Sequence, residues 1–248
     1  MVRPLKMTKR IVLYEDYTFN NGSLFKALRN VFKGISPEFM DADSVLNGAL
    51  TQDVDLFIMP GGASRYVSAK LNGAGNAAIK AYVADGGTYL GICAGAYYGC
   101  RRTEWHPGRA DPISVENELA FFPGTARGPL PFGPAVDDKI AAIVPLTLSA
   151  PPADGTVTKA LYWDGCRFDG AEPETVLARY ADGSAAVIAG THGKGRYILS
   201  GPHPEIDDAQ LDLMTFDVAQ NRHAEIAALK ERGATKDLLT HILKRYVD

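Results

Sequence analysis

The sequence predicts an α/β fold built on a mainly parallel β-sheet with helices on both faces. Over the first two-thirds of the 248 residues, short apolar runs alternate with segments of helical periodicity. Such nearly continuous apolar runs are typical of parallel strands that are buried on both sides. Hydrophobic residues make up 46% of the chain and charged residues 22%, a composition that can form a substantial core.

The first β–α unit begins close to the N-terminus. Residues 11–14 form an apolar run that predicts a buried strand. Ser23 follows in the position of an N-cap, and residues 24–32 repeat apolar side chains at helical spacing. We expect this helix to end before Gly34, because glycine commonly terminates helices.

The alternation then continues as far as the middle of the chain. It predicts a strand over residues 55–59, a helix over 76–85 and a strand over 88–92. Pro60-Gly61-Gly62 ends the first of these strands, and Gly86-Gly87 closes the helix. A further helix is expected from Ala94.

The second half is richer in loops but keeps strand and helix patterns. Proline and glycine are frequent between residues 121 and 152, yet strand-like segments stand on both sides, so we expect no domain linker there. The expected strands cover residues 140–148, 175–180, 185–189 and 195–200, with a hairpin turn at 190–194. Helices are expected over 207–220 and 224–247. The chain is therefore predicted to be one domain, residues 1–248, with C-terminal helices over 207–248.

The charge pattern argues against binding to nucleic acid or membranes. The formal net charge is -3 and the isoelectric point is near 6.0, whereas phosphate binding needs clustered basic residues. The densest basic run combines Arg3, Lys6, Lys9 and Arg10, and we interpret it as a solvated tail. The longest apolar runs are shorter than the ~20 residues of a membrane span, and no signal peptide is apparent. Three cysteines without a paired framework favour a reducing compartment, so a cytoplasmic location is expected.

Cys93 stands in the sequence context of a nucleophile elbow. It is the centre of Gly91-Ile92-Cys93-Ala94-Gly95, directly after a predicted strand and directly before a predicted helix. A nucleophile on such a turn adopts strained dihedral angles, and the flanking glycines remove Cβ clashes. The N-terminus of the following helix favours the thiolate form. The alternative is a cysteine that packs inertly in a tight turn.

Pro60-Gly61-Gly62 is a candidate oxyanion loop. It follows a strand of the predicted parallel sheet, and loops of this kind open at the edge where ligands bind. The backbone N–H groups of Gly61 and Gly62, together with that of Ala94, are natural donors to an oxyanion. Taken alone, Pro-Gly-Gly would more often be a plain turn.

His203 and Glu205 are candidates for the base and for the group that orients it. In an extended segment, residues two apart project to the same side, so Glu205 could hold the His203 imidazole. The flanking Pro202 and Pro204 stiffen the backbone. No His or Cys pair has the spacing of metal ligands, and no phosphate-binding loop is present, so we expect neither a metal nor a cofactor. We interpret Cys100 as part of the packing of the helix after Cys93, and Cys166 as structural.

In combination, these motifs resemble class I glutamine amidotransferase domains, which have a flavodoxin-like three-layer sandwich fold. The resemblance implies a triad of Cys93, His203 and Glu205. A closer resemblance is to the N-terminal domain of eukaryotic biotin–protein ligases and its stand-alone bacterial relatives. It spans residues 10–206 and rests on four segments: 59–63, 71–76, 91–98 and 119–124. The ligase catalytic domain itself is not part of the resemblance.

One departure concerns the substrate. The amidotransferases usually carry Gln two residues after the second glycine of the elbow, whereas this chain has Tyr97. We expect Tyr97 near the mouth of the site, where it would narrow the pocket and make free glutamine a poor substrate; the alternative is that it turns into the core. The sequence thus predicts a cysteine-dependent, amidotransferase-like hydrolase of a small-molecule or peptide-like amide or ester. The competing hypothesis is a non-catalytic ligand-binding or regulatory module.

Overall fold

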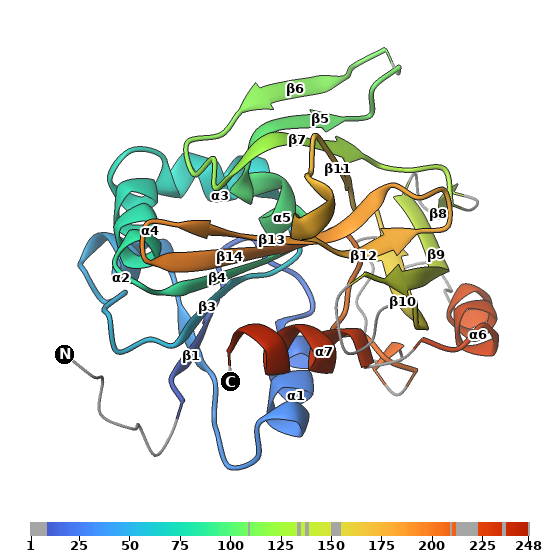
Figure 1. Cartoon of the computed structure of the whole chain (residues 1–248), viewed down its shortest axis with the longest axis horizontal. Helices are drawn as coiled ribbons and strands as arrows, with labels where there is room; N and C mark the ends of the chain where they lie inside the picture. The colour runs from blue at the N-terminus through green and yellow to red at the C-terminus, as the bar shows by residue number, and fades with distance from the viewer. Residues whose placement is uncertain are drawn as a thin grey trace.

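A large mixed sheet runs through the molecule, and a smaller sheet lies beside it (Figure 1). The computed structural model describes residues 9–108, 110–132, 135–136, 139–149, 155–208, 210–211, 223–234 and 237–247. Within these ranges the large sheet has ten strands, in the order β10-β9-β12-β13-β14-β4-β3-β1-β2, and β8 pairs with β9.

One half of the large sheet is parallel, as the sequence predicts. Its strands are β1 (Ile11–Tyr14), β2 (Glu38–Met40), β3 (Leu56–Met59), β4 (Thr88–Ile92) and β14 (Gly195–Ser200). Every residue of β1, β3 and β4 is buried, which explains their continuous apolar sequence. The carboxyl ends of these strands meet at one edge, and the candidate site lies there.

The other half of the large sheet is antiparallel. Its strands are β8 (Ala135–Val136), β9 (Lys139–Leu148), β10 (Val157–Trp163), β12 (Val176–Tyr180) and β13 (Ala185–His192). The predicted hairpin joins β13 to β14 through Gly193, whose φ of 61° suits a tight turn. Short connections of this kind reverse the chain direction, so the sheet is mixed rather than parallel throughout.

Helices cover both faces of the large sheet (Figure 1). Helices α1 (Asn21–Val31) and α7 (Asp237–Tyr246) pack on one face; α2 (Ala42–Leu46), α3 (Ser64–Leu71), α4 (Ala74–Ala84) and α5 (Ala94–Gly99) pack on the other. In β3, Leu56 and Ile58 join the first core while Phe57 and Met59 join the second. This alternation confirms the predicted three-layer arrangement. None of the helices in the described ranges is long and apolar enough to cross a membrane.

A second sheet in the central part of the chain was not predicted. Its strands are β5 (Cys100–Trp105), β6 (Ile113–Glu116), β7 (Phe122–Gly128) and β11 (Arg167–Asp169), in the order β11-β7-β5-β6. A short 3₁₀ turn, η1 (Pro173–Thr175), follows β11. Cys100 therefore begins a strand instead of extending the helix after Cys93, although its thiol still donates to the Ala96 carbonyl.

Two helix predictions need correction. Helix α1 begins after Asn20, whose φ is 60°, and Ser23 is buried inside its first turn instead of capping it. The helix expected over residues 224–247 is two helices, α6 (His223–Glu231) and α7, because Gly233 adopts a φ of 67° between them. Of the helix expected over 207–220, residues 207–208 and 210–211 are not α-helical, and the rest lies outside the described residues.

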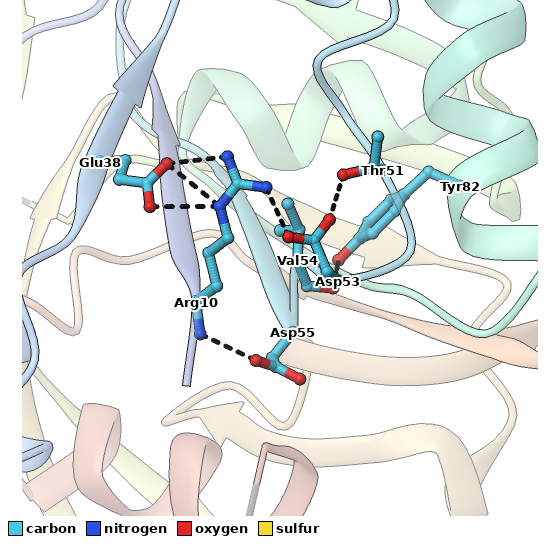
Figure 2. A network of polar contacts seen from close by, with 7 residues as sticks. All are labelled: Arg10, Glu38, Thr51, Asp53, Val54, Asp55 and Tyr82. Atoms are coloured by element: carbon cyan, nitrogen blue, oxygen red, sulfur yellow. Dashed lines mark hydrogen bonds and ion pairs between the residues drawn. The ribbon is translucent and has the colours of Figure 1, made fainter. Parts of the chain in front are cut away.

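Arg10 is not part of a solvated tail, because it links the starts of three strands (Figure 2). Its guanidinium forms ion pairs with Glu38 at 2.8 Å and with Asp53 at 2.9 Å, and its N–H donates to Asp55. The pKa of Arg10 is raised, chiefly by its hydrogen bonds to Glu38. Thr51 supports Asp53 through a further hydrogen bond. The network lies at the amino ends of β1 to β3, opposite the candidate site. Arg3 and Lys6 lie outside the described residues.

Candidate active site

Cys93 occupies a strained turn between β4 and α5. Its φ of 50° and ψ of -106° are rarely adopted by a residue with a side chain. Its N–H donates to the Ser200 carbonyl at 2.8 Å, which ties the turn to β14. A Cβ on Gly91 would lie 2.4 Å from the Gly95 carbonyl oxygen, and one on Gly95 would lie 2.0 Å from that of Met59. Both glycines of the motif are therefore required by close backbone contacts.

His203 and Glu205 form a buried pair. The Nδ1 atom of His203 lies 2.8 Å from Oε1 of Glu205, and the two residues are only 5% and 4% exposed. The His203 N–H donates to the Leu161 carbonyl at 2.7 Å, which holds this segment against β10. Glu205 reaches the ring through a turn rather than the extended segment that we expected. Its second oxygen, Oε2, is buried and accepts no hydrogen bond from the described residues.

The titration of His203 is coupled to both of its neighbours. Burial alone would lower the pKa of His203, but the charges of Glu205 and Cys93 and hydrogen bonds to both residues outweigh burial and raise it well above the ordinary value. With Nδ1 directed to Glu205, the Nε2 side of the ring is left for the Cys93 thiol. A Cβ on Gly61 would lie 2.8 Å from the ring Cε1 and 3.6 Å from the Cys93 Cβ. The structure thus brings Cys93, His203, Glu205 and Gly61 together.

The expected oxyanion donors lie in the loop after β3 and directly after Cys93. Within the described residues, the N–H groups of Gly61, Gly62 and Ala94 donate no hydrogen bond. Gly62 packs so closely on residue 17 that a Cβ would lie 2.2 Å from the Tyr17 carbonyl oxygen. A small hollow lined by Gly62, Ala94 and Tyr98 is too narrow for a water molecule.

Tyr97 does not lie at the mouth of the site. It is 4% exposed, and its hydroxyl group donates to the carbonyl groups of Asp164 and Gly165 at 3.2 and 2.8 Å. Burial raises its pKa well above the usual value. The expectation that Tyr97 narrows the pocket is therefore wrong, and the alternative that it turns into the core is correct.

The segment after β10 contributes to the site, and the sequence analysis missed this. The Cys93 thiol donates to the Trp163 carbonyl at 3.4 Å, and the Trp163 ring centre lies 6.4 Å from that of His203. The next residue, Asp164, has a φ of 48°. The Gly165 carbonyl accepts hydroxyl groups from Tyr97 and Tyr162, each at 2.8 Å. Asp-Gly at the end of an apolar strand is typical of a turn. This dipeptide is the sequence feature that could have indicated a loop here.

The other two cysteines have the structural character that was expected. Cys100 and Cys166 are fully buried, and burial raises the pKa of each thiol well above the ordinary value. In the part of the chain that the structure describes, no cluster of three or more His, Cys, Asp or Glu side chains is arranged to hold a metal ion.

Comparison with known proteins identifies sequence relatives. The family model described as "Biotin-protein ligase, N terminal" matches residues 10–246. An uncharacterized protein of Chlamydia muridarum is 33% identical over 249 residues, covering 96% of this chain and 95% of that protein. A biotin–protein ligase of Schizosaccharomyces pombe is 30% identical over 205 residues, covering 75% of this chain but 32% of the ligase. The match to the ligase thus spans about one third of that longer protein.

Solved structures share the fold at low sequence identity. PurLQS from Thermotoga maritima superposes with a TM-score of 0.57 at 18% identity, covering 80% of this chain and 89% of the other. A crystal structure described as a glutamine amidotransferase gives a TM-score of 0.56, also at 18% identity, with coverage of 79% and 90%. These likenesses show a class I glutamine amidotransferase-like fold, as the sequence motifs indicated, and at this identity they show the fold alone.

Proposed function

The chain belongs to the family of the biotin-protein ligase N-terminal domain, and from this premise we propose that it is a cysteine-dependent, amidotransferase-like hydrolase of an amide or ester. The observation that carries the proposal is the buried His203–Glu205 pair beside a cysteine held at a strained elbow. Burying a charged group is costly unless a group of opposite charge lies beside it. Perturbed pKa values are characteristic of active sites. A purely structural role would require neither the strain at Cys93 nor the raised pKa of His203.

The proposed reaction assigns one role to each group. The proton of the Cys93 thiol first passes to Nε2 of His203, whose raised pKa favours the imidazolium, and the sulfur then attacks the substrate carbonyl carbon. The N–H groups of Gly61, Gly62 and Ala94 stabilise the resulting oxyanion. His203 then returns the proton to the leaving amine or alcohol, and a thioester remains on Cys93. Water, deprotonated by His203, releases the acid and restores the thiol.

Glu205 acts on the imidazole and does not contact the reacting atoms. Its carboxylate accepts a hydrogen bond from Nδ1–H and thereby orients the ring so that Nε2 faces the thiol. Its negative charge also stabilises the imidazolium that forms when the thiol loses its proton. Glu205 is therefore a positioning residue in this proposal.

A non-catalytic binding or regulatory module is the second candidate, and one observation favours it. Cys93 is 9% exposed and its thiol donates to the Trp163 carbonyl, so little of this residue is accessible to a substrate. Glutamine belongs among the substrates to be tested, because the buried Tyr97 does not obstruct the site.

Thiol reactivity tests the proposal directly. Under native conditions and limiting iodoacetamide, mass spectrometry should find alkylation of Cys93 at least tenfold ahead of Cys100 and Cys166, whose pKa values are raised by burial. His203→Gln should slow this labelling. Parallel assays with 4-nitrophenyl acetate and with glutamine should show turnover that is lost in Cys93→Ser. If Cys93 labels no faster than Cys100, the binding module is the better explanation.

A further inference from the structure

We infer that Tyr17, Arg65 and Tyr66 form a subsite for a planar aromatic group that carries a carboxylate. This group would be the part of the substrate attached to the amide or ester that Cys93 attacks, so the inference rests on the proposed function. We call these three residues the tyrosine rim. They lie on the loop after β1 and on the first turn of α3, next to the candidate oxyanion loop.

Two aromatic rings lie together on the surface of the rim. Tyr17 is 49% exposed and Tyr66 is 44% exposed, and their ring centres are 5.1 Å apart at an interplanar angle of 35°. A cation lies near each ring: the Arg65 guanidinium lies 4.6 Å from the Tyr66 ring centre, and the Lys70 ammonium lies 5.6 Å from that of Tyr17. Exposed aromatic rings provide surface on which a planar group can stack.

The rim is attached to the oxyanion loop through the backbone. Thr18 pairs with Gly62 in an isolated bridge, the Ala63 N–H donates to the Tyr17 carbonyl at 3.0 Å, and the Phe19 N–H donates to that of Gly61 at 2.9 Å. Gly61 in turn adjoins the Cys93 Cβ. The backbone that carries Tyr17 is therefore hydrogen-bonded to the loop that adjoins Cys93.

The backbone of Tyr17 is strained. Its φ is 55°, a region that glycine and asparagine adopt readily and that a bulky aromatic residue seldom occupies. Backbone strain of this kind is often found at binding and active sites. Because the Tyr17 side chain is half exposed, core packing does not account for an aromatic residue at this position.

Charge distinguishes the two ends of the rim. Lys70 is paired with Asp16 at 3.0 Å. No carboxylate of the described residues pairs with Arg65, whose guanidinium donates to the Tyr66 hydroxyl at 2.9 Å. The first turn of α3 has no acidic residue, and Ala63 offers no side-chain cap. The Arg65 end of the rim is thus positive, and its guanidinium is the group that would pair with a ligand carboxylate.

Three alkylating probes of the Cys93 thiol test this subsite. Chloroacetamide has neither ring nor charge, N-phenyl chloroacetamide adds a ring, and 4-(chloroacetamido)benzoate adds a ring and a carboxylate. Rates of Cys93 alkylation are followed by mass spectrometry, and each rate is divided by the chloroacetamide rate of the same variant. This ratio corrects for changes in the thiol itself.

The variants separate stacking from charge. In the parent protein the benzoate probe should show the highest ratio. Tyr66→Ala should lower the ratios of both aromatic probes about threefold to tenfold, and Tyr66→Phe should largely keep them. Arg65→Gln should lower the ratio of the benzoate probe alone, by about fivefold. Arg29→Gln is the matched control, because Arg29 lies over the Phe25 ring on the last turn of α1, away from the site.

The outcomes distinguish this inference from the proposed function. If Cys93 reacts readily with chloroacetamide but the aromatic ratios do not change in Tyr66→Ala or Arg65→Gln, the subsite is wrong and the proposed function stands. If Cys93 is inert toward all three probes and toward iodoacetamide, both fail. An equal fall of the benzoate-probe ratio in Arg29→Gln and Arg65→Gln would attribute the effect to the overall charge of the protein and overturn the subsite.

Discussion

The imidazole of His203 is the titrating group on which the proposed chemistry depends. Its pKa is raised although burial opposes this, and the Glu205 carboxylate is the main source of the increase. Glu205→Gln should therefore lower the pKa of His203, because the amide can hydrogen-bond to the ring but cannot stabilise its charge. A pH titration of the ring by NMR, with the signal assigned through His203→Gln, measures this pKa. An unchanged His203 midpoint in Glu205→Gln would contradict the conclusion that the Glu205 charge raises this pKa.

The same pair gives folding stability a defined pH dependence. A histidine whose pKa is raised in the folded state contributes stability that is fully present below its unfolded pKa of about 6.5 and is lost as the pH rises through the folded pKa. Urea unfolding of the parent and of Glu205→Gln should therefore differ most between about pH 5 and 6.5. The difference should shrink at higher pH.

Tyr97 is the residue whose role changed most between sequence and structure. Tyr97→Phe removes the hydroxyl group that donates to the Gly165 carbonyl, which still accepts a hydrogen bond from Tyr162. This variant should therefore lose about 1 kcal/mol of unfolding free energy. Tyr97→Gln, which restores the usual amidotransferase residue, should cost about 2–4 kcal/mol, because it leaves a cavity and a buried amide. Urea denaturation measures both. A stable Tyr97→Gln variant with glutaminase activity would show that position 97 contributes to the substrate site.

At the scale of the element, the elbow depends on Gly95. Gly95→Ala would place a Cβ 2.0 Å from the Met59 carbonyl oxygen, so the turn between β4 and α5 must shift. We expect a loss of about 1–3 kcal/mol in unfolding free energy and slower alkylation of Cys93. Gly22→Ala is the control, since a Cβ there meets nothing within 4 Å. Equal behaviour of the two variants would show that the elbow tolerates side chains.

The small sheet is an element-scale feature that local sequence patterns did not predict. Its strand β6 is exposed along its whole length, and β7 lies in a stretch rich in glycine and proline. Neither strand has the apolar pattern of a buried strand. Their pairing with β5 depends on contacts between separate segments. Thr103 of β5, for example, lies opposite Val115 of β6 and Ala126 of β7.

At the scale of the whole molecule, the Arg10 network ties the start of the chain to the sheet (Figure 2). The Arg10 side chain is 30% exposed, and its partners Glu38 and Asp53 are more than half exposed, so solvent screens both ion pairs. Arg10→Met should cost about 1 kcal/mol at low salt and less at 1 M NaCl. Urea denaturation at both salt concentrations measures this, with Arg179→Met as the control. A loss that is independent of salt would attribute the effect to packing.

Local sequence determined the parts of the site that depend on neighbouring residues. The elbow at Cys93 follows from its glycines and from the strand that precedes it, because close backbone approach excludes any larger side chain there. The pairing of His203 with Glu205 needs only two residues of separation, so it too could be predicted. The buried strands β1, β3 and β4 were predicted for the same reason, since every residue in them is apolar or small enough for burial on both faces.

Tertiary structure decided what depends on contacts between distant segments. The Cys93 thiol reaches the carbonyl of Trp163, which is 70 residues away in the chain, and Tyr97 reaches Gly165 over 68 residues. No periodicity encodes such distances, because which segments meet is set by the packing of the whole sheet. The pairing of β9 with β10 and β12, the burial of Tyr97 and the nearness of the tyrosine rim to the oxyanion loop were all decided at this level.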